Sequence, residues 1–399
     1  MSADRYPRWA MVGALGSRTA DEMSGTALLL LALAATGRVG AGAAAVGSLT
    51  ISAAIGGPLL GVLLDRSRHG LAIALGLYGV GLIGCALALH AGLTVLAALV
   101  ALVAGLLGPA VAGGWSGMLT STDRQRGRRL AAFDAASYSL ASLIGPLIAG
   151  VAYALGGAST PVVVTVVLLG FGTCCAVRAA TRRATADRDR SAASALGDMV
   201  DGIRTIWHDR PLRAVTSASC IGFVGFGMLS VAVPLLGAER LGSAGNGTIL
   251  LALMAAAALA AAAAADRLDL LSRPGPLFVA GTVLVAAGLL VMTVPTRPAA
   301  LIAAALIGLG DGPQLAALIQ VRHLRAPARL RTQIFTTGAS LKISAAGAGA
   351  YLAGALGSDD PTLFTGVAAG LYLVAAIAVL PGLPGLRAER TGMAGNDRI

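Results

Sequence analysis

Five charged side chains lie inside long apolar stretches of this sequence, where a lipid bilayer would surround them. Lys342, the only lysine of the chain, sits in TQIFTTGASLKISAAGAGAYLAGALG. Arg18, Asp21 and Glu22 share the first apolar stretch, and Asp311 lies in LIAAALIGLGDGPQLAALIQ. Because a charge at the centre of a membrane helix costs about 2.5 to 3.5 kcal/mol even on insertion scales, each of them needs a partner or water. Carboxylates in such places can carry a proton, and carboxylates and cations can pair with each other or with a charged solute. All five are therefore candidate site residues.

The composition predicts an integral membrane protein. The chain has 399 residues, of which 56% are hydrophobic and 12% charged, and its mean hydropathy is +0.79. The net charge of +11 comes from arginines in short connectors between apolar stretches, so we expect membrane orientation rather than nucleic-acid binding. No cleavable signal peptide is recognised, because the first apolar stretch itself carries charges. We therefore expect a multi-pass protein of the cell membrane with a cytoplasmic N-terminus.

Twelve segments are long and apolar enough to cross a bilayer, at about 20 residues each. They start near residues 10, 41, 70, 93, 131, 160, 214, 245, 275, 299, 332 and 361. An even number puts both termini on one side, and only Arg38, Arg240 and Arg297 then fall in external loops. The positive-inside rule supports this orientation, with both termini in the cytoplasm.

The longest connector divides the segments into two sets of six. We expect six-helix bundles over residues 1–180 and 214–385, a cytoplasmic linker over 181–213 and a cytoplasmic tail over 386–399. Apolar residues at helical spacing predict an amphipathic surface helix in the linker. The two halves also repeat in the same order, which indicates a duplicated unit. The repeated pairs are Asp65-Arg66 with Asp266-Arg267, and Gly108-Pro109 with Gly312-Pro313.

Helical geometry makes predictions about which charges pair. Arg18, Asp21 and Glu22 fall within about 100° of arc, so Arg18 can pair with either acid at i,i+3 or i,i+4 spacing. Counting residues from opposite membrane faces brings Asp311 and Lys342 to a depth similar to theirs. We favour Asp21 or Glu22 as a proton carrier and Asp311 as the partner of Lys342.

Two alternatives concern structural ion pairs. Asp311 and Lys342 could form a static pair that only fixes helix packing, with no part in coupling. Asp134, four residues beyond the basic loop DRQRGRRL, is expected to form a salt bridge at the membrane edge.

The whole chain resembles the Major Facilitator Superfamily, in its twelve segments, its repeat and the segment GVLLDRSRHG. Gly61, Asp65 and Arg66 match that family's loop signature, whereas Arg68 and His69 depart from it. The resemblance implies an all-α fold of two pseudo-symmetric six-helix bundles, and a cytoplasmic gate at the Asp65 loop and its repeat at Asp266 and Arg267. It also implies that the first and tenth segments line the cavity.

A second segment resembles the antiporters of this family. Gly145, Pro146 and Gly150 in SLIGPLIAG are similar to the core of the antiporter signature, although Ala141 and Ala149 stand where glycines are expected. Glycine and proline here suit a hinge and suit tight packing equally well.

The expected function is secondary active transport by alternating access. The main interpretation is proton-coupled export of small organic molecules such as drugs or metabolites, and the alternative is an uptake symporter or uniporter for a small solute. We expect a monomer that works with protons and the lipid bilayer, without cofactor, metal or nucleic acid. The four histidines and four cysteines show neither catalytic nor metal-ligand spacing, so an enzyme is not expected.

Overall fold

The computed structural model describes residues 5–66, 69–119, 124–180, 192–327 and 330–382. Helices make up nearly all of this part, and no β-strand occurs in it. A helix satisfies its own backbone hydrogen bonds, which lipid cannot do, so an all-helical fold agrees with the apolar composition.

The first half of the chain contains α1 to α7. Their bounds are α1 Arg5–Thr36, α2 Val39–Arg66, α3 Gly70–His90, α4 Thr94–Gly105, the π-helix η1 Ala110–Gly114, α5 Trp115–Met118, α6 Arg124–Gly156 and α7 Thr160–Ala180. The linker helix α8 spans Ala192–His208.

The second half contains α9 to α14. Their bounds are α9 Arg210–Leu241, η2 Ala244–Asn246, α10 Gly247–Arg267, η3 Leu270–Ser272, α11 Pro274–Met292, α12 Arg297–Arg325, α13 Arg331–Ala355, α14 Pro361–Val379 and η5 Leu380–Gly382. Side-chain caps start several of these helices: the Leu212 N–H donates to Asp209, and the Thr362 N–H donates to Asp360.

Each predicted segment start falls within one residue of a helix, but fewer helices meet a strict criterion for spanning. In the described residues, seven helices are long and apolar enough to cross a membrane. They are α3, α7, α9, η2 with α10, α11, α12, and α14 with η5. Shorter apolar stretches occur at Val39–Ala53, Thr94–Gly105 and Leu140–Gly156. The repeat is also imperfect, because α4 ends just before Gly108, whereas α12 runs unbroken through Gly312 and Pro313.

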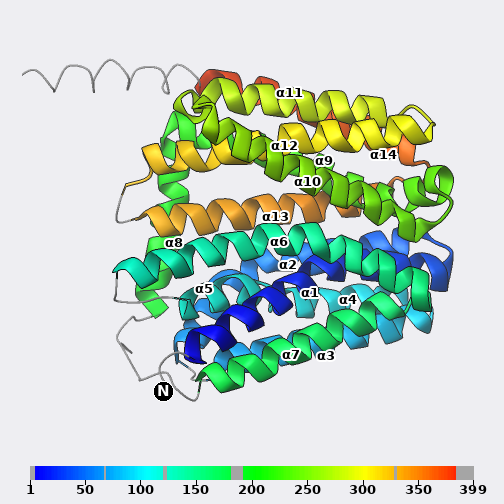
Figure 1. Cartoon of the computed structure of the whole chain (residues 1–399), viewed down its shortest axis with the longest axis horizontal. Coiled ribbons are helices and arrows are strands. Elements are labelled where there is room, and N and C mark those ends of the chain that lie inside the picture. The colour runs from blue at the N-terminus through cyan, green and yellow to red at the C-terminus, as the bar shows by residue number, and fades with distance from the viewer. Residues whose placement is uncertain (1–4, 67–68, 120–123, 181–191, 328–329, 383–399) are drawn as a thin grey trace, which may run out of the picture.

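The two halves form two groups of helices that lie side by side (Figure 1). We call one end of the molecule the basic end: there α1 begins, and α7, α10 and α12 finish with arginines in their last turns. The opposite end, with the turns around Gly37, Gly157, Gly242 and Gly357, is called the far end. Each of these four glycines has a positive φ, between 62° and 82°, which permits the tight turn.

Close helix contacts join the two halves toward the far end. A methyl group on Gly47 of α2 would lie 2.6 Å from a ring carbon of Tyr351 on α13, and Ser48 hydrogen bonds to that tyrosine. On the other side, a methyl group on Gly150 of α6 would lie 3.1 Å from Cβ of Thr248 on α10. The small residues therefore allow two tight seams, α2 with α13 and α6 with α10.

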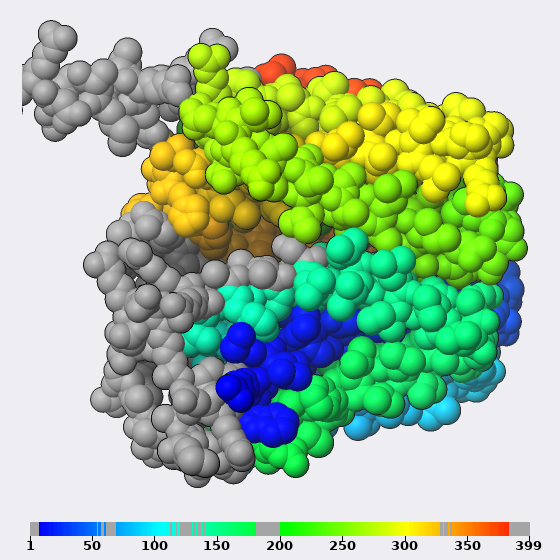
Figure 2. All heavy atoms as spheres, viewed as in Figure 1, coloured from blue at the N-terminus to red at the C-terminus, as the bar shows by residue number. Residues whose placement is uncertain are grey.

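Toward the basic end the halves part. Figure 2 shows a hollow between α6 and α10 with α13 visible inside it, which closes toward the far end. The seams and the hollow together describe a molecule closed at its far end and open toward its basic end.

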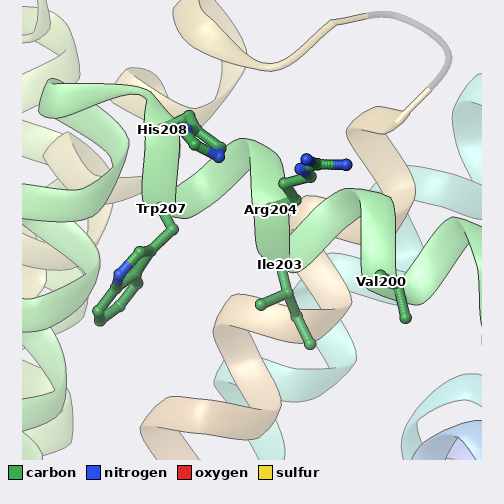
Figure 3. Close-up of a pocket in the computed structure, with 5 residues that line it drawn as sticks. All are labelled: Val200, Ile203, Arg204, Trp207 and His208. Atoms are coloured by element: carbon green, nitrogen blue, oxygen red, sulfur yellow. The ribbon is translucent and has the colours of Figure 1, made fainter.

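The amphipathic helix predicted in the linker is present as α8. Its Ile206 is buried, whereas Val200, Ile203 and Trp207 are exposed. With Arg204 and His208 they line a shallow surface groove of about 370 Å³ (Figure 3). Residues 181–191 of the predicted linker lie outside the described part of the chain.

Candidate functional site

Arg18 belongs to a buried polar cluster that α1 forms with α6. Its guanidinium, 1% exposed, donates to Asp134 Oδ1 at 2.7 Å and to Ser116 Oγ at 3.1 Å. It also lies 3.7 Å from the centroid of the Tyr138 ring. Ser116 in turn donates to the second carboxylate oxygen of Asp134 at 2.8 Å. The cluster is held by charge-assisted hydrogen bonds and a cation–π contact.

This geometry corrects two predictions. Arg18 does not pair with Asp21 or Glu22, and Asp134 serves an interior ion pair rather than a salt bridge to the basic loop. Helical side chains lean toward the N-terminus of their helix, so Arg18 leans away from two acids that follow it. Its charge is used by Asp134, and the two acids of α1 are left without it.

Asp21 lies near the middle of α1, which has 32 residues. The Tyr78 hydroxyl, from α3, donates to its Oδ1 at 2.8 Å. Ser24 lies 3.4 Å from the same hydroxyl and donates to the Asp21 carbonyl at 2.7 Å. Asp21 is thus anchored within its own half of the molecule.

Glu22, the next residue, has a different environment. Its side chain is exposed. Its backbone and Cβ pack closely on Gly145 of α6, where an added methyl group would lie 2.9 Å from Glu22 Cβ. A glycine is required there so that α6 can approach α1. Of the two acids, Glu22 is the one free to meet water or a solute.

Lys342 lies in the second half, on α13. Its Nζ lies 3.7 Å from the centroid of the Phe223 ring on α9. Gly349, two turns further along α13, lets α9 approach, since a methyl group there would lie 3.0 Å from Val224 Cα. A desolvated cation over an aromatic face gains about 2 kcal/mol or more.

The predicted partnership of Lys342 with Asp311 is wrong for this conformation. In the part of the chain that the structure describes, no ion pair joins them, and Oδ1 of Asp311 is buried without a hydrogen bond. A static pair that fixes helix packing is therefore excluded here. The two charges remain within electrostatic influence of each other.

Sequence reasoning missed Tyr78 and Arg322, and it assigned no role to Phe223. Tyr78 and Phe223 are isolated aromatics whose contacts come from other helices. Arg322, close to the end of α12, was counted among the connector arginines, yet it is only 4% exposed. Its spacing from Gln314 and Leu318, which are also buried, was the signal that could have found it.

The remaining predicted residues lie apart from these charges. Asp65 and Arg66 end α2 and Asp266 and Arg267 end α10, which keeps the repeated pairs at matching helix ends. Asp266 and Arg267 are exposed, and nothing is described of the side chains of Gly61, Asp65 and Arg66. Pro146 lies within α6 between Gly145, which contacts α1, and Gly150, which contacts α10.

No metal centre is formed by the residues that the structure describes: no group of three His, Cys, Asp or Glu side chains is placed to hold an ion. The interior therefore offers a solute charged side chains. Acids on α1 belong to one half, and cations on α12 and α13 belong to the other.

The chain is similar to known transporters in sequence pattern and in fold. It matches the family model described as Major Facilitator Superfamily over residues 10–356. No match was found among curated protein sequences.

Solved structures share the fold at low sequence identity. A structure of an auto-inhibited POT family peptide transporter has a TM-score of 0.73 at 14% identity, over 96% of this chain and 97% of that one. A POT family transporter in complex with 5-aminolevulinic acid has a TM-score of 0.71 at 11% identity, over 96% and 97%. A peptide transporter POT in complex with sulfate has a TM-score of 0.70 at 16% identity, over 94% of each chain.

Proposed function

This chain belongs to the Major Facilitator Superfamily of transporters, and on that premise we propose that it carries a small organic solute across a membrane by alternating access. It is a transporter and not an enzyme. The molecule crosses the membrane twelve times, with α4, η1 and α5 together forming one crossing. We assign to both bundles and the linker the residue ranges expected from the sequence, and we place the basic end in the cytoplasm of the cell. The described conformation is then the inward-open one.

The observation that carries the proposal is the separation of unpaired charge between the halves. Glu22 is exposed on α1, while Lys342 lies on α13 without an acid in contact. A solute with an amine and a carboxylate, or a proton and an anionic solute, could bring these charges into balance between the halves. Opposite charges attract more strongly in a medium of low dielectric than in bulk water.

Glu22 is the proposed proton carrier. Asp21 accepts a hydrogen bond from Tyr78 at 2.8 Å, so we assign it the role of positioning α3 against α1. Glu22 has no such donor among the described residues and can exchange its proton with water in the hollow. Asp311 and Lys342 lie together in the opposite half and respond to the solute there.

Uptake together with protons is the proposed direction, ahead of export. The export interpretation rests on Gly145, Pro146 and Gly150. Both glycines have packing roles in this structure, Gly145 against Glu22 and Gly150 against Thr248, and these roles explain them without an antiport mechanism. The similar structures include peptide transporters and a transporter with 5-aminolevulinic acid, which supports a small amino- and carboxylate-bearing solute.

Proteoliposomes with an imposed pH gradient test the direction. For protein molecules whose far end faces the outside of the liposome, we expect alanylalanine or 5-aminolevulinic acid to accumulate inside when the outside medium is acidic. Protein-free liposomes are the control. Accumulation that requires an acidic lumen instead would establish export, and accumulation that ignores the gradient would establish a uniporter.

A further inference from the structure

Arg322 is a buried cation with unused hydrogen-bond donors. Its side chain is 4% exposed, and its Nε and Nη2 atoms have no hydrogen-bond partner. In the described part of the chain no carboxylate pairs with it. Its nearest aromatic contact is weak, since the guanidinium lies 6.0 Å from the centroid of the Phe335 ring. A buried charge without a partner is costly, and such a group calls for an explanation.

The guanidinium lies one helical turn from Lys342. It rests on Gly338 of α13, where a methyl group would lie 2.6 Å from Arg322 Cζ. Gly338 and Lys342 are four residues apart, so they share a face of α13. On α12 the eleven residues from Asp311 to Arg322 make three turns, so those two also share a face. Two cations therefore follow one another from the basic end toward the middle of the membrane.

Helix α9 packs beside the two cations, Arg322 of α12 and Lys342 of α13. We call the region that these three helices enclose around the two cations the corner. Phe223 lies under the ammonium of Lys342 at 3.7 Å. Cys220 is one turn closer to the basic end on the same face, and the charges of both Arg322 and Lys342 act on its sulfhydryl. The neighbouring Arg325 is balanced by Asp209 at 2.6 Å and does not add to the excess. Asp311 offsets one cation at most, which leaves one positive charge in the corner.

We propose that Arg322 and Lys342 form a subsite for the carboxylate of the transported solute. The unused Nε and Nη2 donors of Arg322 match the two oxygens of a carboxylate, and Lys342 supplies a second charge deeper in the membrane. The proposal rests on the proposed function and names a chemical requirement of it: the solute carries an anionic group. The amine or the proton of the same transport cycle then belongs to Glu22 in the other half.

The charge of the subsite can be measured at Cys220 without any solute. The full-length protein, purified with Cys174→Ser to remove the exposed thiol, is treated with an anionic or a cationic methanethiosulfonate. In either reaction the thiolate attacks the reagent sulfur, a disulfide forms and a sulfinate leaves. We expect the sulfonate reagent to label Cys220 faster than the trimethylammonium reagent, and Arg322→Gln to lower that rate ratio by roughly tenfold or more.

Matched variants and a competitor separate the subsite from general effects. Arg325→Gln removes a paired arginine from the same helix end and should leave the ratio nearly unchanged, while Arg322→Lys should restore it. In the Cys174→Ser parent protein, which keeps Arg322, acetate should slow the labelling of Cys220 by the sulfonate reagent. An unchanged ratio in Arg322→Gln, or a preference for the cationic reagent in the parent protein, would overturn the proposal. Labelling does not require transport. The labelling test of the subsite can therefore be negative while the transport test of the proposed function is positive, or the other way round.

Discussion

The buried pair of Arg18 and Asp134 makes a prediction about stability. Asp134→Asn keeps the size of the side chain but leaves a guanidinium that is 1% exposed without its counter-charge. Removing one partner of a buried ion pair costs about 3–5 kcal/mol. Asp134 is itself 22% exposed, and asparagine still accepts a hydrogen bond from Ser116, so we expect about 2–3 kcal/mol.

The assay is the apparent melting temperature of the purified protein. For units of 150–250 residues, each kcal/mol shifts the midpoint by about 2–4 °C, so Asp134→Asn should lower it by roughly 4–12 °C. Asp209→Asn is the control: its pair with Arg325 is partly exposed at both ends, and asparagine also caps helices. We expect that variant to lose at most about 1 kcal/mol.

A double variant identifies the partner. Arg18→Gln combined with Asp134→Asn removes both charges and should be more stable than the sum of the single losses. If Asp134→Asn behaves like Asp209→Asn, while Asp21→Asn or Glu22→Gln destabilises strongly, then Arg18 pairs within α1 after all. The assignment of two unbalanced acids to α1 would then be wrong.

Two further predictions concern the seams and the lysine. Gly47→Ala places a methyl group 2.6 Å from the Tyr351 ring, so the far end should open more often. In a Ser48→Cys background, adding Gly47→Ala should therefore make the cysteine react at least about fivefold faster with an impermeant maleimide. Equal rates with and without Gly47→Ala would contradict the seam. Phe223→Leu removes the ring beneath Lys342 and should cost about 2 kcal/mol, seen as a lower melting temperature, whereas Phe223→Tyr keeps the ring and should not. Equal losses in the two variants would contradict the cation–π contact.

The sequence was sufficient for the class of fold and for the depth of the charges. Apolar length locates helices, and counting residues along them brought Asp21 to the middle of α1, where the structure has it. The glycines of SLIGPLIAG also indicated either a hinge or tight packing, and Gly145 and Gly150 make close helix contacts. These features are local, so each can be predicted from the sequence of a single helix.

Partners of the charges could not be predicted, because they come from distant parts of the chain. Arg18 meets Asp134, 116 residues away, although two acids lie within four residues of it. Lys342 meets Phe223 on another helix rather than the acid predicted from matching depth. Depth restricts which residues can meet, but the rotation of each helix about its axis decides which do. That rotation follows from packing of the whole bundle.

The relation between solute and proton movement tests the central claim most directly. Proteoliposomes containing the native chain or Glu22→Gln are given alanylalanine or 5-aminolevulinic acid while the internal pH is recorded, with Asp21→Asn as the matched acid variant. We predict a solute-evoked pH change that Glu22→Gln abolishes even if the solute still binds. A native protein that moves the solute without any pH change, or a Glu22→Gln variant with native proton flux, would contradict the assignment of Glu22 as the proton carrier.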